Sequence, residues 1–161
     1  MRQREVGEAY EASTSALEAA KGQRLSLRRA IGGLEEALAG PDAEAGVRPD
    51  RLATALERLQ EVFAVHVQVT EAPGGLYQEI LENAPRMANR VTRFRREHAE
   101  IGDGIRRGID ESRAAGDGDD PEALQALRDH AVRLFADLVR HRKRGLDLVY
   151  EAYHVDIGGE S

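Results

Sequence analysis

Apolar residues recur at alternating steps of three and four positions along most of the chain. The second stretch of this kind runs Leu52, Leu56, Leu59 and Phe63. Such spacing places an apolar stripe on one face of an α-helix, where it packs against neighbouring helices. The stripes predict four helical segments, at about residues 3–39, 50–83, 85–115 and 121–155.

The breaks between these segments are rich in proline, glycine and aspartate. The sequence Pro73-Gly74-Gly75 falls inside the second segment and predicts a kink there. Asp120 followed by Pro121 marks a helix start, because aspartate caps a helix and proline suits its first turn. Long helices joined by short loops pack antiparallel to one another. We therefore predict a single all-α domain over residues 1–161, an up-down-up-down four-helix bundle.

Composition narrows the functions that such a bundle serves. The formal charge of −6, from 29 acidic and 23 basic residues, argues against a nucleic-acid binder, which needs a basic face. The chain has no cysteine, so any metal must be held by nitrogen and oxygen ligands. No apolar run approaches the roughly 20 residues of a membrane span, and the first residues lack a signal-peptide core. We expect a cytoplasmic protein that binds neither nucleic acid nor membrane.

Three of the five histidines occupy stripe positions where a leucine is expected. They are His66, His98 and His141, one on each of three segments. Counting from the helix ends at 1.5 Å per residue, the depths of His66 and His98 differ by about 6 Å, and those of His98 and His141 by about 4.5 Å. Loop geometry and the kink absorb such offsets, so we predict that three imidazoles converge on one layer of the core. His130 and His154 lie off the stripes.

The first segment places Arg24 at nearly the same depth as this layer. Arginine donates hydrogen bonds and keeps its charge, so it does not bind a metal. Buried imidazoles without partners cost roughly 1–3 kcal/mol for each unmet group, so something polar must meet them. The residues leave three options open. Arg24 pairs with Glu71 in a metal-free polar layer that includes Thr70, ordered water meets the rings, or the three histidines and Glu71 hold one Fe or Zn ion.

Three stretches of the chain resemble the hemerythrin-like, or HHE cation-binding, family. They are VHVQVTEAPGGLYQEI (65–80), RFRREHAEIG (93–102) and LVRHRKRGLDLVYEAY (138–153). The resemblance implies a four-helix bundle with a non-haem di-iron site in its core, and a role in O₂, NO or redox sensing. It matches the three stripe histidines to ligand histidines of the family.

The chain departs from the family pattern at the other ligand positions. Arg24 stands where the first helix should offer a histidine. Thr70 and Gly145 stand four residues after two of the stripe histidines, where the resemblance implies carboxylates. We therefore expect a hemerythrin-like bundle with an incomplete di-iron site, a non-enzymatic binding or interaction module that is metal-free and has Arg24 in place of a ligand. The alternative is a protein that binds one Fe or Zn ion.

The stretch near the end of the sequence, LVYEAYHVDIGG, is more apolar than a terminal tail usually is. An apolar tail either caps the open end of a bundle or docks on another chain. Residues 148–159 are therefore a candidate cap for the bundle, or a candidate docking segment for a second copy of the chain or for a protein partner.

Overall fold

A computed structural model describes residues 2–40 and 46–154, with side chains described from residue 18 onward. Four long helices dominate these residues: α1 (Arg2–Ala39), α2 (Pro49–Glu71), α4 (Ala88–Ala115) and α5 (Pro121–His154). A short helix, α3 (Leu76–Asn83), and a 3-10 turn, η2 (Pro85–Met87), join α2 to α4. The described residues contain no strand, so the predicted all-α class is confirmed.

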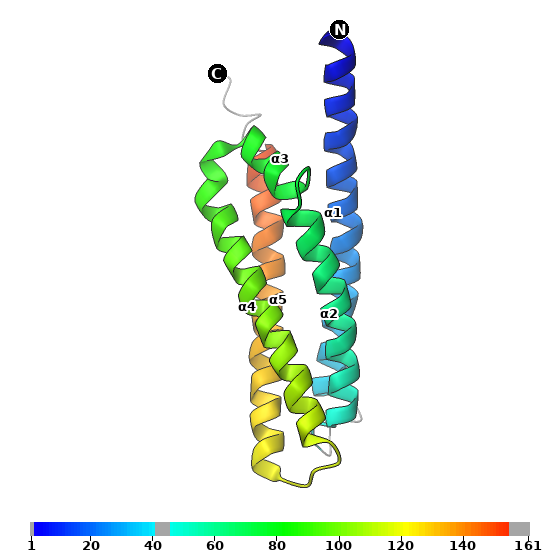
Figure 1. Cartoon of the computed structure of the whole chain (residues 1–161). Helices are drawn as coiled ribbons and strands as arrows, with labels where there is room; N and C mark the ends of the chain where they lie inside the picture. Colours follow the sequence, from blue (N-terminus) through cyan, green and yellow to red (C-terminus); the bar gives the residue numbers. More distant parts are fainter. Residues whose placement is uncertain (1, 41–45, 155–161) are drawn as a thin grey trace.

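The four long helices run in alternating directions and lie side by side (Figure 1). Helix α1 contacts α2, α2 contacts α4, α4 contacts α5, and α5 closes the ring against α1. The bundle therefore has four walls, in the order α1, α2, α4, α5. Helix α3 packs against α1 and α5 at the end opposite the loop that precedes α5 (Figure 1). Within the described ranges, no helix combines the length and apolar character that a membrane span requires.

The kink predicted in the second segment is a complete interruption between two helices. Ala72, the residue after α2, has an extended backbone, because the following Pro73 disfavours helical conformations there. Gly74 adopts a φ of +76°, a conformation that other residues rarely adopt. At Gly75 an added Cβ would lie only 2.7 Å from the carbonyl oxygen of Val69. The Pro-Gly-Gly sequence thus turns the chain and lets it restart as α3.

The two later segments begin close to where the sequence places them. The third opens with the turn η2 at Pro85 and continues as α4. The last begins at Pro121, and Oδ1 of Asp120 accepts a hydrogen bond from the backbone N–H of Glu122 at 3.1 Å, which is the predicted cap. Helix α5 continues to His154. The candidate docking stretch, residues 148–159, begins within α5, and its part from residue 155 onward lies outside the described residues.

Buried apolar side chains form two clusters along the bundle axis. The large cluster fills the half nearest the loop that precedes α5 and includes Leu27, Ile31, Leu34, Leu38, Leu52, Leu56, Leu59, Phe63, Ile101, Ile105, Ile109, Leu127, Leu134 and Leu138. The small cluster fills the end around α3 and contains Ala20, Leu76, Tyr77, Ile80, Ala84, Met87, Val91, Phe94, Leu148 and Ala152. On each long wall, the residues between the two clusters include the polar positions selected from the sequence.

Candidate metal centre

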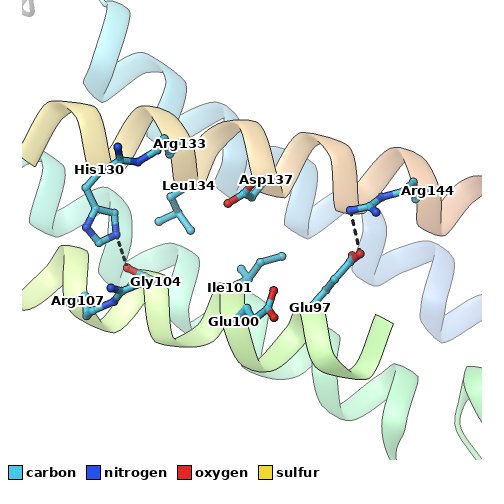
Figure 2. A pocket seen from close by; sticks show the side chains of 10 residues that line it. All are labelled: Glu97, Glu100, Ile101, Gly104, Arg107, His130, Arg133, Leu134, Asp137 and Arg144. Atoms are coloured by element: carbon cyan, nitrogen blue, oxygen red, sulfur yellow. Dashed lines mark hydrogen bonds and ion pairs between the residues drawn. The ribbon is translucent and has the colours of Figure 1, made fainter. Parts of the chain in front are cut away.

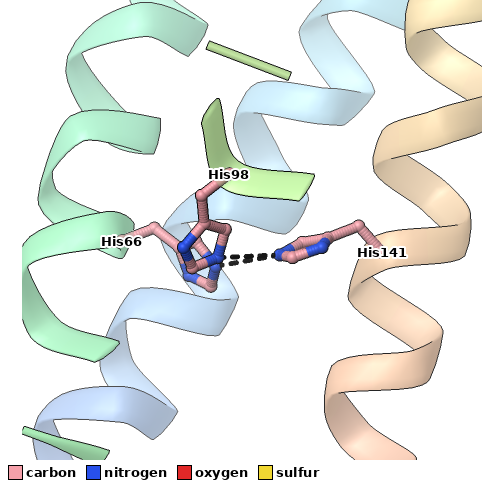
Figure 3. A group of neighbouring side chains, drawn as sticks. All are labelled: His66, His98 and His141. Carbon is pink, nitrogen blue, oxygen red and sulfur yellow. Dashed lines mark hydrogen bonds between the residues drawn. The ribbon is translucent and has the colours of Figure 1, made fainter. Parts of the chain in front are cut away.

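Three histidines meet in the layer between the two clusters (Figure 3). His66, His98 and His141 come from α2, α4 and α5, and one ligand-type nitrogen of each lies within 4.8 Å of the others. Nε2 of His141 lies 3.0 Å from Nε2 of His98 and 3.4 Å from Nε2 of His66. His98 and His141 are buried, and His66 is partly buried. The convergence predicted by counting along the helices is therefore present.

Two carboxylates hold the outer nitrogens of two of these rings. Nδ1 of His98 lies 3.0 Å from Oε1 of Glu71, and Nδ1 of His141 lies 2.8 Å from Oε2 of Glu97. Glu97 also pairs with Arg144 at 2.9 Å. Because an ionised carboxylate only accepts hydrogen bonds, each Nδ1 carries the proton, and each Nε2 presents a lone pair to the centre of the layer. Proteins orient metal-binding histidines in this way.

Burial keeps the three rings uncharged. Desolvation, then the charges of His141 and Arg24, lowers the pKa of His66 to about 3. Burial is also the largest cause that lowers the pKa of His98. It lowers the pKa of His141 as well, although Glu97 opposes that shift. Near neutral pH the layer therefore holds imidazoles in the form that binds metal ions.

A cavity of about 40 Å³ adjoins the layer, lined by residues of α1, α2, α3 and α5. The polar side chains in its lining include Arg24, His66, Thr70, Tyr77 and His141. A water molecule needs roughly 10–15 Å³ of such volume, so the cavity has room for a small ligand beside the rings. The Thr70 hydroxyl is already engaged, because it donates to the carbonyl oxygen of His66 at 2.8 Å.

Arg24 reaches this cavity from α1 but does not meet the partner predicted for it. Glu71 contacts His98 instead. The Arg24 guanidinium makes no ion pair with any residue whose side chain the structure describes, and burial lowers its pKa. The adjacent Gln23 donates to the carbonyl oxygen of Val62 at 3.0 Å, which ties α1 to α2 beside the layer.

Tyr77 belongs to the layer although the sequence pattern did not select it. Its hydroxyl oxygen lies 3.3 Å from Nε2 of His98, and its ring stacks on that imidazole with the planes 15° apart. The side chain is 3% exposed, and burial raises its pKa above the usual phenol value. The helical spacing of α2 does not continue across Pro73-Gly74-Gly75, so counting along that helix does not place Tyr77.

Glu97 is the second residue that the sequence pattern missed. It precedes His98 on α4, and adjacent helical residues point in different directions, so it serves the histidine of α5 and not its own neighbour. The sequence signal that could have identified Glu97 is its place directly before a stripe histidine. Glu71, by contrast, was selected as a ligand, and it lies on the outer side of His98, at the nitrogen that points away from the centre.

A groove of about 380 Å³ runs between α4 and α5 on the outer side of the layer (Figure 2). Glu97 and Arg144 pair at one end of it. At the other end the ring of His130 contacts Glu111 and the carbonyl oxygen of Gly104. His130 is thus separate from the histidine layer, as its position off the stripe predicts.

Comparisons with known proteins do not assign this arrangement to a family. No family model, curated protein or solved structure matches the chain. The side chains themselves indicate the chemistry that the layer supports. They provide uncharged imidazole nitrogens that converge in a buried layer, two carboxylates that orient the rings, and a small adjoining cavity.

Proposed function

We propose that this chain is a metal-binding helical bundle that holds one Fe or Zn ion among the Nε2 atoms of His66, His98 and His141. The observation that carries the proposal is the 3.0 Å approach between Nε2 of His98 and Nε2 of His141. Both rings donate their Nδ1 protons to carboxylates, so in neutral rings these two Nε2 atoms oppose each other as lone pairs. A contact of this kind needs a positive species between the nitrogens.

A metal ion suits this position better than a proton does. Burial lowers the pKa of all three histidines, which disfavours a charged ring in the layer. With metal–nitrogen bonds of about 2.0–2.1 Å and tetrahedral angles, ligand nitrogens lie about 3.3 Å apart. The Nε2 separations of 3.0 and 3.4 Å are close to that value. Small movements of the rings would complete such a site.

The side chains favour one ion over two. A second ion would need bridging carboxylates, and the positions four residues after His66 and His141 hold Thr70 and Gly145. The carboxylates that are present contact the outer nitrogens of the rings. Three imidazoles without a bridging acid match a mononuclear Zn or Fe site. The proposal therefore keeps the metal-binding alternative of the hemerythrin-like interpretation and leaves out its di-iron chemistry.

The adjoining cavity extends the proposal to small-molecule binding at the ion. Three protein ligands leave at least one coordination position for water or another small molecule. The cavity of about 40 Å³ touches both His66 and His141. In this form the chain is a binding or sensing module for a small molecule at a single metal.

A metal-free binding module is the second candidate. One observation favours it: Arg24, a permanent cation, lines the same cavity and already lowers the pKa of His66. A fixed positive charge close to a divalent ion in a low-dielectric core opposes its binding. In this candidate the cavity beside Arg24 takes a small anion without a metal.

Metal analysis of the full chain separates the two candidates. The protein should be purified without chelator or nickel affinity, assayed for bound metals, and titrated with Zn²⁺ and Fe²⁺ by calorimetry. We expect one ion per chain, no ion in His98→Ala or in the bulkier His98→Leu, and an unchanged ion in His154→Ala. Circular dichroism should verify that each variant is folded. A folded wild-type chain that binds neither ion would leave the metal-free module.

A further inference from the structure

The three histidines leave a tetrahedral ion one ligand short, and Tyr77 places a further oxygen donor at the layer. Its hydroxyl oxygen lies 3.3 Å from Nε2 of His98. Its aromatic ring is stacked on the same imidazole at a centroid distance of 5.7 Å, which fixes the direction in which the hydroxyl points. Tyr77 also lines the cavity beside the layer, together with His66 and His141.

We propose that Tyr77 is the fourth protein ligand of the metal, bound through its phenolate oxygen. This inference rests on the proposed function. Donor atoms on a tetrahedral ion with bonds of about 2.0 Å lie about 3.3 Å apart, and the distance from Oη to Nε2 of His98 matches this separation. On binding, the O–H bond of Tyr77 breaks, its proton passes to the solvent, and an oxygen–metal bond forms. No electron is transferred.

The interruption between α2 and α3 is what delivers this ligand. Tyr77 follows His66 by eleven residues, and in a continuous helix it would stand about 16.5 Å further along the axis. A tyrosine side chain does not span that distance. The turn at Pro73-Gly74-Gly75 ends α2 and redirects the chain, so that the hydroxyl returns to the layer. The φ of +76° at Gly74 and the crowded position of Gly75 make this turn specific to its sequence.

A phenolate ligand also explains how a metal ion can bind close to the positive charge of Arg24. The guanidinium lines the same cavity as Tyr77 and makes no ion pair with any side chain in the described residues. A divalent ion with three neutral imidazoles keeps its full charge, which a nearby arginine opposes. The negative charge of a phenolate offsets part of that repulsion. Three imidazoles with one anionic oxygen suit Zn²⁺ and iron, and a small molecule in the cavity would then bind the ion as a fifth ligand.

The test is a Zn²⁺ titration of the full metal-free chain, followed by near-ultraviolet difference absorption and by proton release into a weakly buffered indicator solution. Zn²⁺ has no redox chemistry, so the signal reports ligation alone. We expect a phenolate difference spectrum worth one tyrosine per bound ion. Tyr77→Phe, which removes only the hydroxyl, should bind Zn²⁺ at least about tenfold more weakly, with no phenolate signal and one proton fewer released.

Tyr153→Phe is the matched control. Its hydroxyl donates to Glu79, away from the histidine layer, so this variant should keep the phenolate signal and the Zn²⁺ affinity. Stoichiometric Zn²⁺ binding without a phenolate signal, or equal affinity in Tyr77→Phe, would overturn the fourth ligand and leave the three-histidine site standing. A folded wild-type chain that does not bind Zn²⁺ or Fe²⁺ would overturn both proposals.

Discussion

The two apolar clusters lie within the same four walls but are built differently. The large cluster consists of Leu, Ile, Val, Ala and Phe side chains, and all of its buried members except Val47 come from long helices that continue without a break. The small cluster is closed by the short helix α3 and includes the hydroxyl-bearing Tyr77. The histidine layer lies at their boundary. The difference indicates that the large cluster supplies stability and aligns the walls, while the end around α3 adds the Tyr77 hydroxyl to histidines that the long helices carry.

The strongest test of this division removes volume from the large cluster. Leu56 is fully buried, so Leu56→Ala should lower the free energy of unfolding by about 2–5 kcal/mol. Urea denaturation of the metal-free protein measures this change, and Leu25→Ala, at a half-exposed position, should stay within about 0.5 kcal/mol of wild type. The folded Leu56→Ala variant should still bind one ion. Loss of binding in the folded variant would show that the two clusters are not separable.

The pH dependence of stability tests the histidine layer between the two clusters. Free histidine has a pKa near 6.5, whereas burial lowers the pKa of His66 to about 3. Burial also lowers the pKa of His98. Between pH 6.5 and pH 3 these histidines bind protons in the unfolded chain but stay neutral in the folded chain. The free energy of unfolding should therefore fall as the pH falls below 6.5. The loss is about 1.4 kcal/mol per pH unit for each ring that stays neutral.

Denaturation of the metal-free chain between pH 7.5 and 5 measures this loss. His66→Leu should flatten the profile, because it removes one of the rings that resist protonation, whereas His154→Ala, at an exposed site, should leave it unchanged. A wild-type profile without slope would mean that the rings protonate freely in the folded state. The three histidines would then not form a buried, neutral layer between the two apolar clusters.

The smallest expected effect on stability belongs to Glu71. Glu71→Gln keeps a carbonyl oxygen that accepts from Nδ1 of His98 but removes the negative charge. Outer contacts of this kind change metal affinity by about 10–100-fold, so Zn²⁺ binding should weaken by that factor while the metal-free stability changes little. Glu61→Gln, on the exposed face of the same helix, is the control. Equal Zn²⁺ affinity in both variants would contradict an orienting role for Glu71.

The sequence predicts much of this arrangement because helical geometry is regular. Steps of three and four residues place His66, His98 and His141 on inward faces, and a rise of 1.5 Å per residue brings them to one depth. The counting works within an unbroken helix. It does not extend past Gly75, where a turn of specific shape sets the position of Tyr77.

The partners of charged side chains were harder to predict. Arg24 was expected to pair with Glu71, yet that carboxylate lies against His98. Glu97 contacts the histidine of the neighbouring helix, which depends on how α4 and α5 are rotated about their axes. Periodicity gives the face on which a residue lies, but the rotation of packed helices and the side-chain rotamers decide which atoms meet.

The three histidines come from only three of the four walls. An ion bound there would cross-link α2, α4 and α5, whereas α1 would be held by apolar packing and by hydrogen bonds, from Gln23 to Val62 and from Arg128 to Leu38. Transient breathing of α1 would then leave every coordinate bond intact. Since α1 also lines the cavity, it is the one wall of that cavity that the ion would not cross-link to the others.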